Sequence, residues 1–246
     1  SSQGQGWKLM PAAQLDRNGW VRSLQPGQTA PRPLMLPPAP FRTVDVRCEY
    51  HARGEISSGG VARVKDRGEG WLTLELSPTG AADEGAWIEL ISTDAANPVR
   101  DIDCRDPAFP RDARFHPDFL KFVKDFKVVR FLDWQKTNDN IDVSWETRAR
   151  QSYSSQVTAA GASIEDMIAV ANETGADPWF LMPYKADETY IREFARLVRA
   201  KLNPDRTVYV ELGNEVWNDM FDAAQQAQRE GMMMKLGGRV AKRCQM

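Results

Sequence analysis

The sequence predicts an α/β plus all-β protein, with an antiparallel β-sandwich followed by a region of parallel strands and helices. Two observations indicate this division. Between residues 41 and 104, apolar and polar residues alternate in short runs that Gly, Asp and Pro separate, as in antiparallel strands. From about residue 126, short apolar runs alternate with amphipathic helical stretches, which is the order expected for parallel strands joined by helices.

The chain divides into three predicted parts. Residues 1–40 are rich in Pro and Gly and predict an extended segment, which could wrap the next domain or serve as a linker. Residues 41–104 form the predicted β-sandwich domain, and the run WLTLEL at 71–76 shows its alternation clearly. Residues 105–246 form the predicted α/β domain, which begins with a connector containing a helix near 116–126.

The α/β domain reads as three strands separated by helices. Strands are predicted at 126–134, 177–184 and 207–215, with helices at 163–175, 187–202 and 217–230. Ser163 and Asp166 have the spacing of a capping box, and Gly175 ends that helix. Right-handed crossovers would place the strands in one parallel sheet, so a doubly wound sheet or part of a (β/α) barrel fits.

Composition excludes several classes of site. The net charge is -2, which favours neither nucleic acid nor an anionic membrane as partner, and no apolar run is long enough to span a bilayer. Only two histidines are present, and the three cysteines lack metal-ligand spacing, so we expect no metal and no cofactor. One disulfide is possible, with Cys48 and Cys104 as the candidate pair. Carboxylates are the remaining candidate catalysts.

Polar and aromatic residues gather where the three parallel strands are predicted to end. In either fold the carboxyl ends of the strands form the functional face. Tryptophan at such an edge either packs into the core or offers a flat surface on which a sugar ring stacks. The candidate residues at this edge are Asp133, Trp134, Tyr184, Lys185, Asn214, Glu215, Trp217 and Asn218.

The run VYVELGNEVWN, residues 208–218, resembles the fourth-strand motif of clan A glycoside hydrolases, the cellulase and mannanase superfamily. VVRFLDW at 128–134 is similar to the second strand of that clan, and PWFLMPY at 178–184 takes the place of the third. The wider run 163–219 also resembles an uncharacterised group of bacterial secreted proteins that have a β-sandwich before the barrel. The resemblance implies a (β/α)8 TIM-type barrel, of which this chain holds only a part, and a secreted or periplasmic location.

The resemblance also implies a retaining two-carboxylate mechanism on a β-linked polysaccharide. Glu215 would be the general acid/base, because a glycosidic oxygen leaves easily only once a carboxylic acid has protonated it. Asn214 would contact the sugar 2-hydroxyl, and Arg130 would orient the nucleophile. The implied substrate-binding residues are Asp133, Trp134, Tyr184, Lys185, Trp217 and Asn218.

Alternative interpretations remain open at this point. Glu215 could be a solvated residue in the first turn of a helix, Asn214 its N-cap, and Arg130 a structural ion-pair partner. The clan's nucleophile follows a seventh strand for which no counterpart is expected in this sequence, and Asp133 is the best candidate within the chain to replace it. Tyr184 stands where related sequences often have His. The chain could be a fragment of a longer protein, a second chain or copy could complete the barrel, or the fold could be a smaller α/β domain that only resembles a barrel. In function, the alternative is a non-catalytic carbohydrate-binding or structural assembly protein.

Overall fold

The structure, a computed structural model, describes residues 7–37, 42–140 and 143–236. These residues form two compact units. The first runs to Ala113 and also includes Ser152–Ser154, and the second contains Arg114–Gln151 and the chain after Ser154. From the sequence we also expected residues 239–246 to belong to a further helix, and these residues lie outside the described ones.

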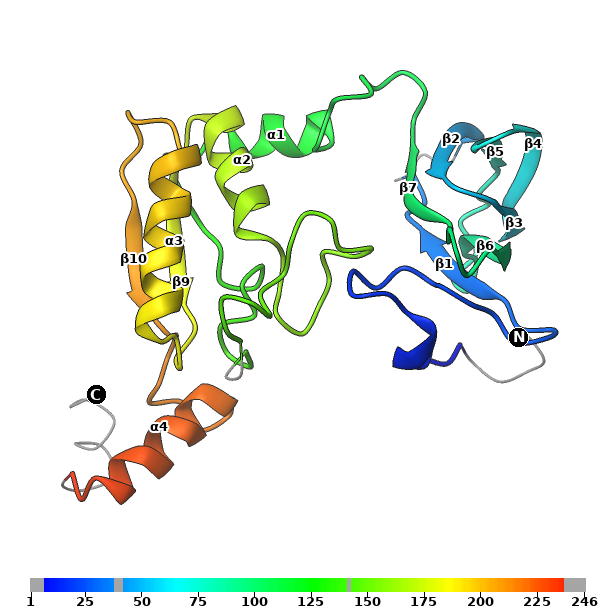
Figure 1. The fold of residues 1–246 in the computed structure, drawn as a ribbon. Helices are drawn as coiled ribbons and strands as arrows, with labels where there is room; N and C mark the ends of the chain where they lie inside the picture. The colour runs from blue at the N-terminus through cyan, green and yellow to red at the C-terminus, as the bar shows by residue number, and fades with distance from the viewer. Residues whose placement is uncertain (1–6, 38–41, 141–142, 237–246) are drawn as a thin grey trace. The chain divides into compact units, whose positions relative to one another are not determined.

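The first unit contains two antiparallel sheets (Figure 1). A short 3-10 helix, η1 (Ala12–Gln14), precedes the strands. The three-stranded sheet has, in spatial order, β1 (Ala30–Leu34), β6 (Ala86–Thr93) and β3 (Gly54–Gly60). The four-stranded sheet has β4 (Ala62–Gly68), β5 (Trp71–Leu76), β2 (Val44–His51) and β7 (Arg100–Arg105).

The core of the first unit draws on both sheets. Along β5 the side chains of Leu72, Leu74 and Leu76 are buried, whereas those between them are half-buried. Together with residues of β3 and β6 they form one hydrophobic cluster. Cys48 of β2 lies opposite Cys104 of β7 in the antiparallel register, and the two form a disulfide.

Strand β1 lies inside the Pro-rich segment that we expected to be an extended linker or wrap. It pairs antiparallel with β6, so that Ala30 lies opposite Leu90. Pro31 and Pro33 have no N–H to donate, and they are tolerated because β1 is an edge strand that needs hydrogen bonds on one side only. The segment is therefore part of a sheet.

Ser152–Ser154 belong to the first unit because they bond to a turn near its N-terminus. The backbone N–H of Ser154 donates to the carbonyl of Asn18 at 2.8 Å, and its hydroxyl donates to the carbonyl of Gly19 at 2.9 Å. The indole N–H of Trp20 lies 3.4 Å from the carbonyl oxygen of Ser152. The Ser152 hydroxyl also lies 3.5 Å from Asn18 Oδ1, and these contacts together hold the short segment against residues 18–20.

The described residues of the second unit form one small parallel sheet and four helices. The sheet has the order β10 (Tyr209–Leu212), β9 (Asp177–Met182) and β8 (Val128–Arg130). The helices are α1 (Pro117–Val123), α2 (Ile164–Thr174), α3 (Glu188–Lys201) and α4 (Asp222–Met233). Helix α3 packs on the sheet through Phe194, whose ring meets Phe180 of β9 edge-on with centroids 5.1 Å apart.

The predicted partial (β/α)8 TIM-type barrel is wrong. The described residues of the second unit form an open sheet of three strands, with β8 and β10 at its edges, and no TIM barrel is evident. A barrel closes only if each strand finds a partner on both sides. Here β10 leads into α4 and pairs with β9 alone within the described chain. The protein is instead mostly β, with three sheets and four α-helices among the described residues.

Two helices also differ from the predictions. Helix α4 begins at Asp222 rather than near 217, because residues 213–221 form turns. The connector helix was expected to have an apolar face made of Phe119, Leu120, Phe122, Val123 and Phe126. This is wrong in part, since Phe122 and Phe126 are exposed. The predicted ends of α2 agree with the structure: the Ser163 side chain accepts from the N–H of Asp166, and Gly175 has the left-handed φ of 78°.

Candidate functional site at the carboxyl edge of the parallel sheet

The Asn-Glu pair lies where the chain turns away from the end of β10. The N–H of Gly213 still donates to the carbonyl of Met182, at the end of β9, with a distance of 2.9 Å. Gly213 has a φ of +64°, and Glu215 has a φ of 41°, which is uncommon for a residue with a side chain. The backbone therefore bends sharply on both sides of Asn214, directly at the sheet edge.

Asn214 is held by side chains from two other parts of the second unit. Arg130, the last residue of β8, donates from Nη2 to Asn214 Oδ1 at 2.8 Å. Asn214 Nδ2 in turn donates to Asn138 Oδ1 at 2.8 Å. Only 8% of Asn214 is exposed. Its amide plane is fixed, and no described residue accepts the second N–H hydrogen of Nδ2.

Arg130 makes further contacts that fix its guanidinium. Its Nη2 and Nε donate to Glu211 Oε2 at 2.8 and 3.2 Å. Its guanidinium carbon lies 5.1 Å from the centre of the Trp179 ring on β9, where cation–π attraction favours it. Sequence analysis predicted Arg130 as a site residue but missed Glu211, because the two strands that carry them are separated by β9.

Glu215 stands on an exposed turn with two other predicted residues. Asn218 Nδ2 donates to Glu215 Oε2 at 2.9 Å, and the N–H of Asn218 donates to the carbonyl of Glu215 at 2.7 Å. Trp217 lies in the same turn and is 61% exposed. The turn thus presents a carboxylate, an amide and an indole together at the surface.

Tyr184 and Lys185 meet at Glu230, a residue of α4 that sequence analysis did not single out. Tyr184 Oη donates to Glu230 Oε2 at 3.2 Å, and Lys185 Nζ lies 3.9 Å from Glu230 Oε1. Burial and the neighbouring Glu230 raise the pKa of Tyr184 to about 12. Figure 1 shows α4 beyond the carboxyl end of β10, so the helix supplies Glu230 to this side of the sheet.

Asp133 and Trp134 are placed differently from the other predicted residues. Trp134 stacks on Phe119 with ring centroids 6.0 Å apart and packs against the core of the second unit. Asp133 is exposed, and its carbonyl accepts from the N–H of Lys136. Among the described residues, no hydrogen bond joins either side chain to the turn that carries Glu215.

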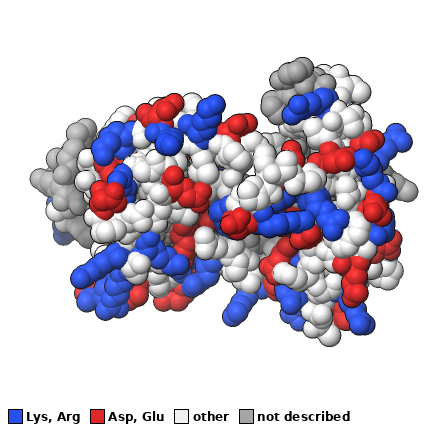
Figure 2. Space-filling view, turned by 90° about the horizontal axis from the view of Figure 1, so that it is seen from above, with Lys and Arg blue, Asp and Glu red and all other residues white. Residues whose placement is uncertain are grey.

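The described part of the chain holds no group of three or more His, Cys, Asp or Glu side chains that could bind a metal ion. None of its helices has the length and apolar character needed to cross a bilayer. Figure 2 shows positive and negative side chains interspersed over the face it presents.

Comparisons of the chain with protein-family models, with curated proteins and with solved structures found no match. The resemblance to clan A glycoside hydrolases therefore rests on the sequence motifs themselves. What the geometry adds is the set of contacts that Arg130, Asn138 and Asn218 make with the Asn-Glu pair.

Proposed function

We propose that the chain is a glycoside hydrolase that acts on a β-linked polysaccharide, with Glu215 as its general acid/base. The observation that carries the proposal is the link from Arg130 through Asn214 to Asn138, which fixes the amide next to Glu215. A network of this kind, at the edge where parallel strands end, holds a polar group in place for a ligand.

Among the described residues, these contacts leave one carboxylate oxygen of Glu215 and one amide hydrogen of Asn214 available to a substrate. Asn218 bonds one carboxylate oxygen of Glu215, so the other can face a glycosidic oxygen and deliver the proton that makes it a leaving group. The second amide hydrogen of Asn214 can bind the 2-hydroxyl, a contact that strengthens in the transition state. The exposed Trp217 ring offers a face for a sugar. Retention further requires a second carboxylate that acts as the nucleophile.

The test compares the protein with Glu215→Gln, both expressed in the native host so that natural partners stay bound. Hydrolysis of cellulose, mannan, xylan and mixed-linkage glucan is followed by release of reducing ends. We expect Glu215→Gln to lower the rate by about 10²–10⁴-fold while binding is retained. The matched control is Glu173→Gln, an exposed glutamate on α2. Hydrolysis by Glu215→Gln at the parental rate would rule out the acid/base role.

A second candidate function is a non-catalytic glycan-binding or structural assembly protein. The observation that favours it is the exposed apolar character of the β10 edge. Val208, Tyr209, Val210 and Leu212 are 36%, 44%, 57% and 56% exposed. A strand edge that is unpaired within the described residues favours strand addition by another chain or a second copy.

Two results would favour this second function over hydrolysis. The first is a protein that binds a β-glycan, loses that binding in Asn214→Ala, and cleaves none of the four substrates. The second is self-association in sedimentation velocity that Val210→Lys abolishes. The matched control is Ile191→Lys, which places the same charge at an exposed position of α3. Equal association of both variants would argue against the β10 edge as an interface.

A further inference from the structure

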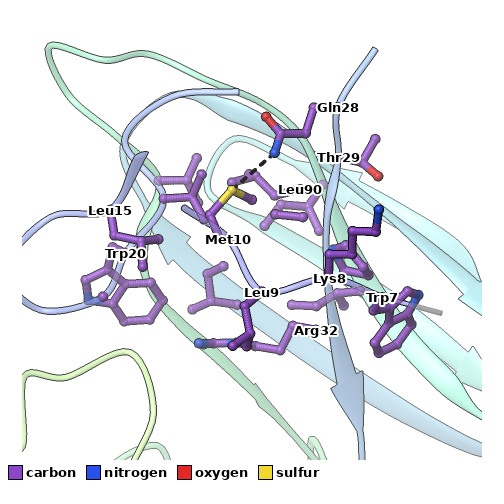
Figure 3. A pocket seen from close by; sticks show the side chains of 18 residues that line it. Trp7, Lys8, Leu9, Met10, Leu15, Trp20, Gln28, Thr29, Arg32 and Leu90 are labelled. Atoms are coloured by element: carbon purple, nitrogen blue, oxygen red, sulfur yellow. Dashed lines mark hydrogen bonds between the residues drawn. The ribbon is translucent and has the colours of Figure 1, made fainter. Parts of the chain in front are cut away.

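The first unit contains a cavity of about 1000 Å³ that is separate from the Asn-Glu turn. Its walls include Ile56 of β3, Ile88 and Leu90 of β6, and Val99, each no more than 5% exposed. Residues 7–10 and Trp20 line it as well. Figure 3 shows these side chains converging around the cavity, with Trp7 and Trp20 at opposite sides of the view and Arg32 between them.

Arg32 is the distinctive polar group of this cavity. It lies on β1 opposite Ile88 in the strand register, and its guanidinium carbon is 5.3 Å from the centre of the Trp20 ring. No hydrogen bond or ion pair joins its side chain to another residue of the described chain. Burial lowers the pKa of Arg32. A half-buried cation without an anionic partner is unfavourable, and a bound anion would relieve that cost.

Two other polar side chains around the cavity, those of Gln28 and Thr29, already have partners. Gln28 Nε2 donates to Met10 Sδ at 3.3 Å, and Gln28 Oε1 accepts from Gln14 at 2.8 Å. Thr29 Oγ1 donates to Glu89. The cavity therefore offers one guanidinium, the nearby exposed amine of Lys8, and walls that are otherwise mostly aliphatic.

We propose that this cavity binds a fatty acid, with the carboxylate on Arg32 and the acyl chain against the aliphatic walls. A guanidinium binds a carboxylate through two parallel charge-assisted hydrogen bonds. Apolar walls suit an alkyl chain, whereas the hydroxyls of a sugar would lose their hydrogen bonds to water there. The volume falls at the upper end of the range for small-molecule sites. This site is independent of the glycan proposal, because it involves none of the same residues.

The test uses the full chain and dodecanoate below its micelle concentration, with binding measured by calorimetry and tryptophan fluorescence. We expect saturable binding that Arg32→Met weakens by at least about tenfold, the effect of losing one charge-assisted contact. The matched control, Arg63→Met, removes an exposed arginine of β4 and should leave the affinity unchanged. Circular dichroism and thermal unfolding of each variant establish that it is folded.

A second comparison needs no variant. Dodecanol has the same chain without the charge, so the wild-type protein should bind it at least about tenfold more weakly than dodecanoate. Equal affinity for the two ligands would overturn the role of Arg32, as would dodecanoate binding that Arg32→Met does not change. Preferential binding of naphthylacetate would overturn the acyl assignment in favour of an aromatic carboxylate. Failure to bind dodecanoate at all would overturn the proposal.

Discussion

Arg130 and Asn214 are 84 residues apart in the sequence, and a 2.8 Å hydrogen bond joins Nη2 of the first to Oδ1 of the second. The bond connects the end of β8 to the turn after β10, across the full width of the sheet. Since the same Nη2 also donates to Glu211, one guanidinium fixes both the strand and the turn that follows it. The position of Glu215 thus depends on a residue from the opposite edge of the sheet.

A double-mutant cycle tests this relationship. We expect Arg130→Met and Asn214→Ala each to lower the free energy of unfolding by about 1–2 kcal/mol, because each leaves a partly buried polar group without its partner. Together they should show a coupling energy of about 1 kcal/mol. Urea unfolding measures all four proteins. Arg199→Met, an exposed arginine of α3, should combine additively with Asn214→Ala. Additive effects of the first pair would contradict the link.

The Arg114–Asp166 pair predicts acid sensitivity. Arg114 donates two bonds of 2.7 and 2.6 Å to Asp166, whose side chain is 5% exposed. Burial acts to raise the pKa of Asp166, but hydrogen bonds from Arg114, Gln151 and Ser163 outweigh it and lower the pKa. The pair therefore stabilises the fold above the unfolded-state pKa of about 4, and this contribution is lost as the pH falls through the lower folded value.

Asp166→Asn provides the measurement for that prediction. Its free energy of unfolding should lie below the parental value at pH 7, and the difference should shrink as the pH falls below about 4. Asp222→Asn, a change at an exposed carboxylate, serves as the control. A difference between Asp166→Asn and the parent that stays constant with pH would contradict the assignment.

Two tyrosines should lose their phenolic protons at a higher pH than an ordinary tyrosine does. Burial raises the pKa of Tyr190 to about 12, and burial together with Glu230 does the same for Tyr184. Since the folded state disfavours the phenolate, stability should be lost as the pH rises from about 10 toward 12. Phenolate absorbance measures the titration. Tyr184→Phe and Tyr190→Phe should each remove part of the absorbance change that occurs near pH 12. The same titration in urea should show ordinary tyrosines only. A single phase near pH 10 in the folded protein would refute the prediction.

The Cys48–Cys104 disulfide should make a large contribution to the stability of the first unit. The two residues are 56 positions apart, and the chain-entropy model gives about 4 kcal/mol for a loop of that size. We expect the double variant Cys48→Ala/Cys104→Ala to have a free energy of unfolding about 4 kcal/mol below the parental value, measured as a lower urea concentration at the midpoint of unfolding. Alkylation and mass spectrometry should find one reactive cysteine before reduction and three afterwards. Labelling of all three without reductant would contradict the bond.

Local structure was largely predictable from the sequence. The alternation of Leu72, Leu74 and Leu76 identified a strand with one buried face, and Ser163 and Gly175 marked the two ends of a helix. These features depend on residues within a few positions of one another, so hydrophobic period and end-capping suffice to find them.

The features that could not be predicted depend on contacts between residues that are far apart in the sequence. The barrel prediction assumed that strands would continue to pair beyond β10, which no residue in 208–218 can specify. The ion pair between Arg130 and Glu211 was missed because it forms across β9. The cavity beside Arg32 was missed for a similar reason. Residues 1–40 were expected to be an extended segment, whereas residues 7–10 and Trp20 line the cavity and Ala30–Leu34 pair with β6.

The short segment Ser152–Ser154 has a consequence for dissecting the protein. Its bonds to Asn18 and Gly19 mean that the first unit is not a contiguous stretch of sequence. A chain truncated after Ala113 would lose those bonds and uncover the turn they protect, so proteases should cut it near residues 18–20 more readily than the intact chain. The shortest N-terminal fragment that keeps the unit whole extends to Ser154, and it carries with it a part of the second unit that includes Arg130.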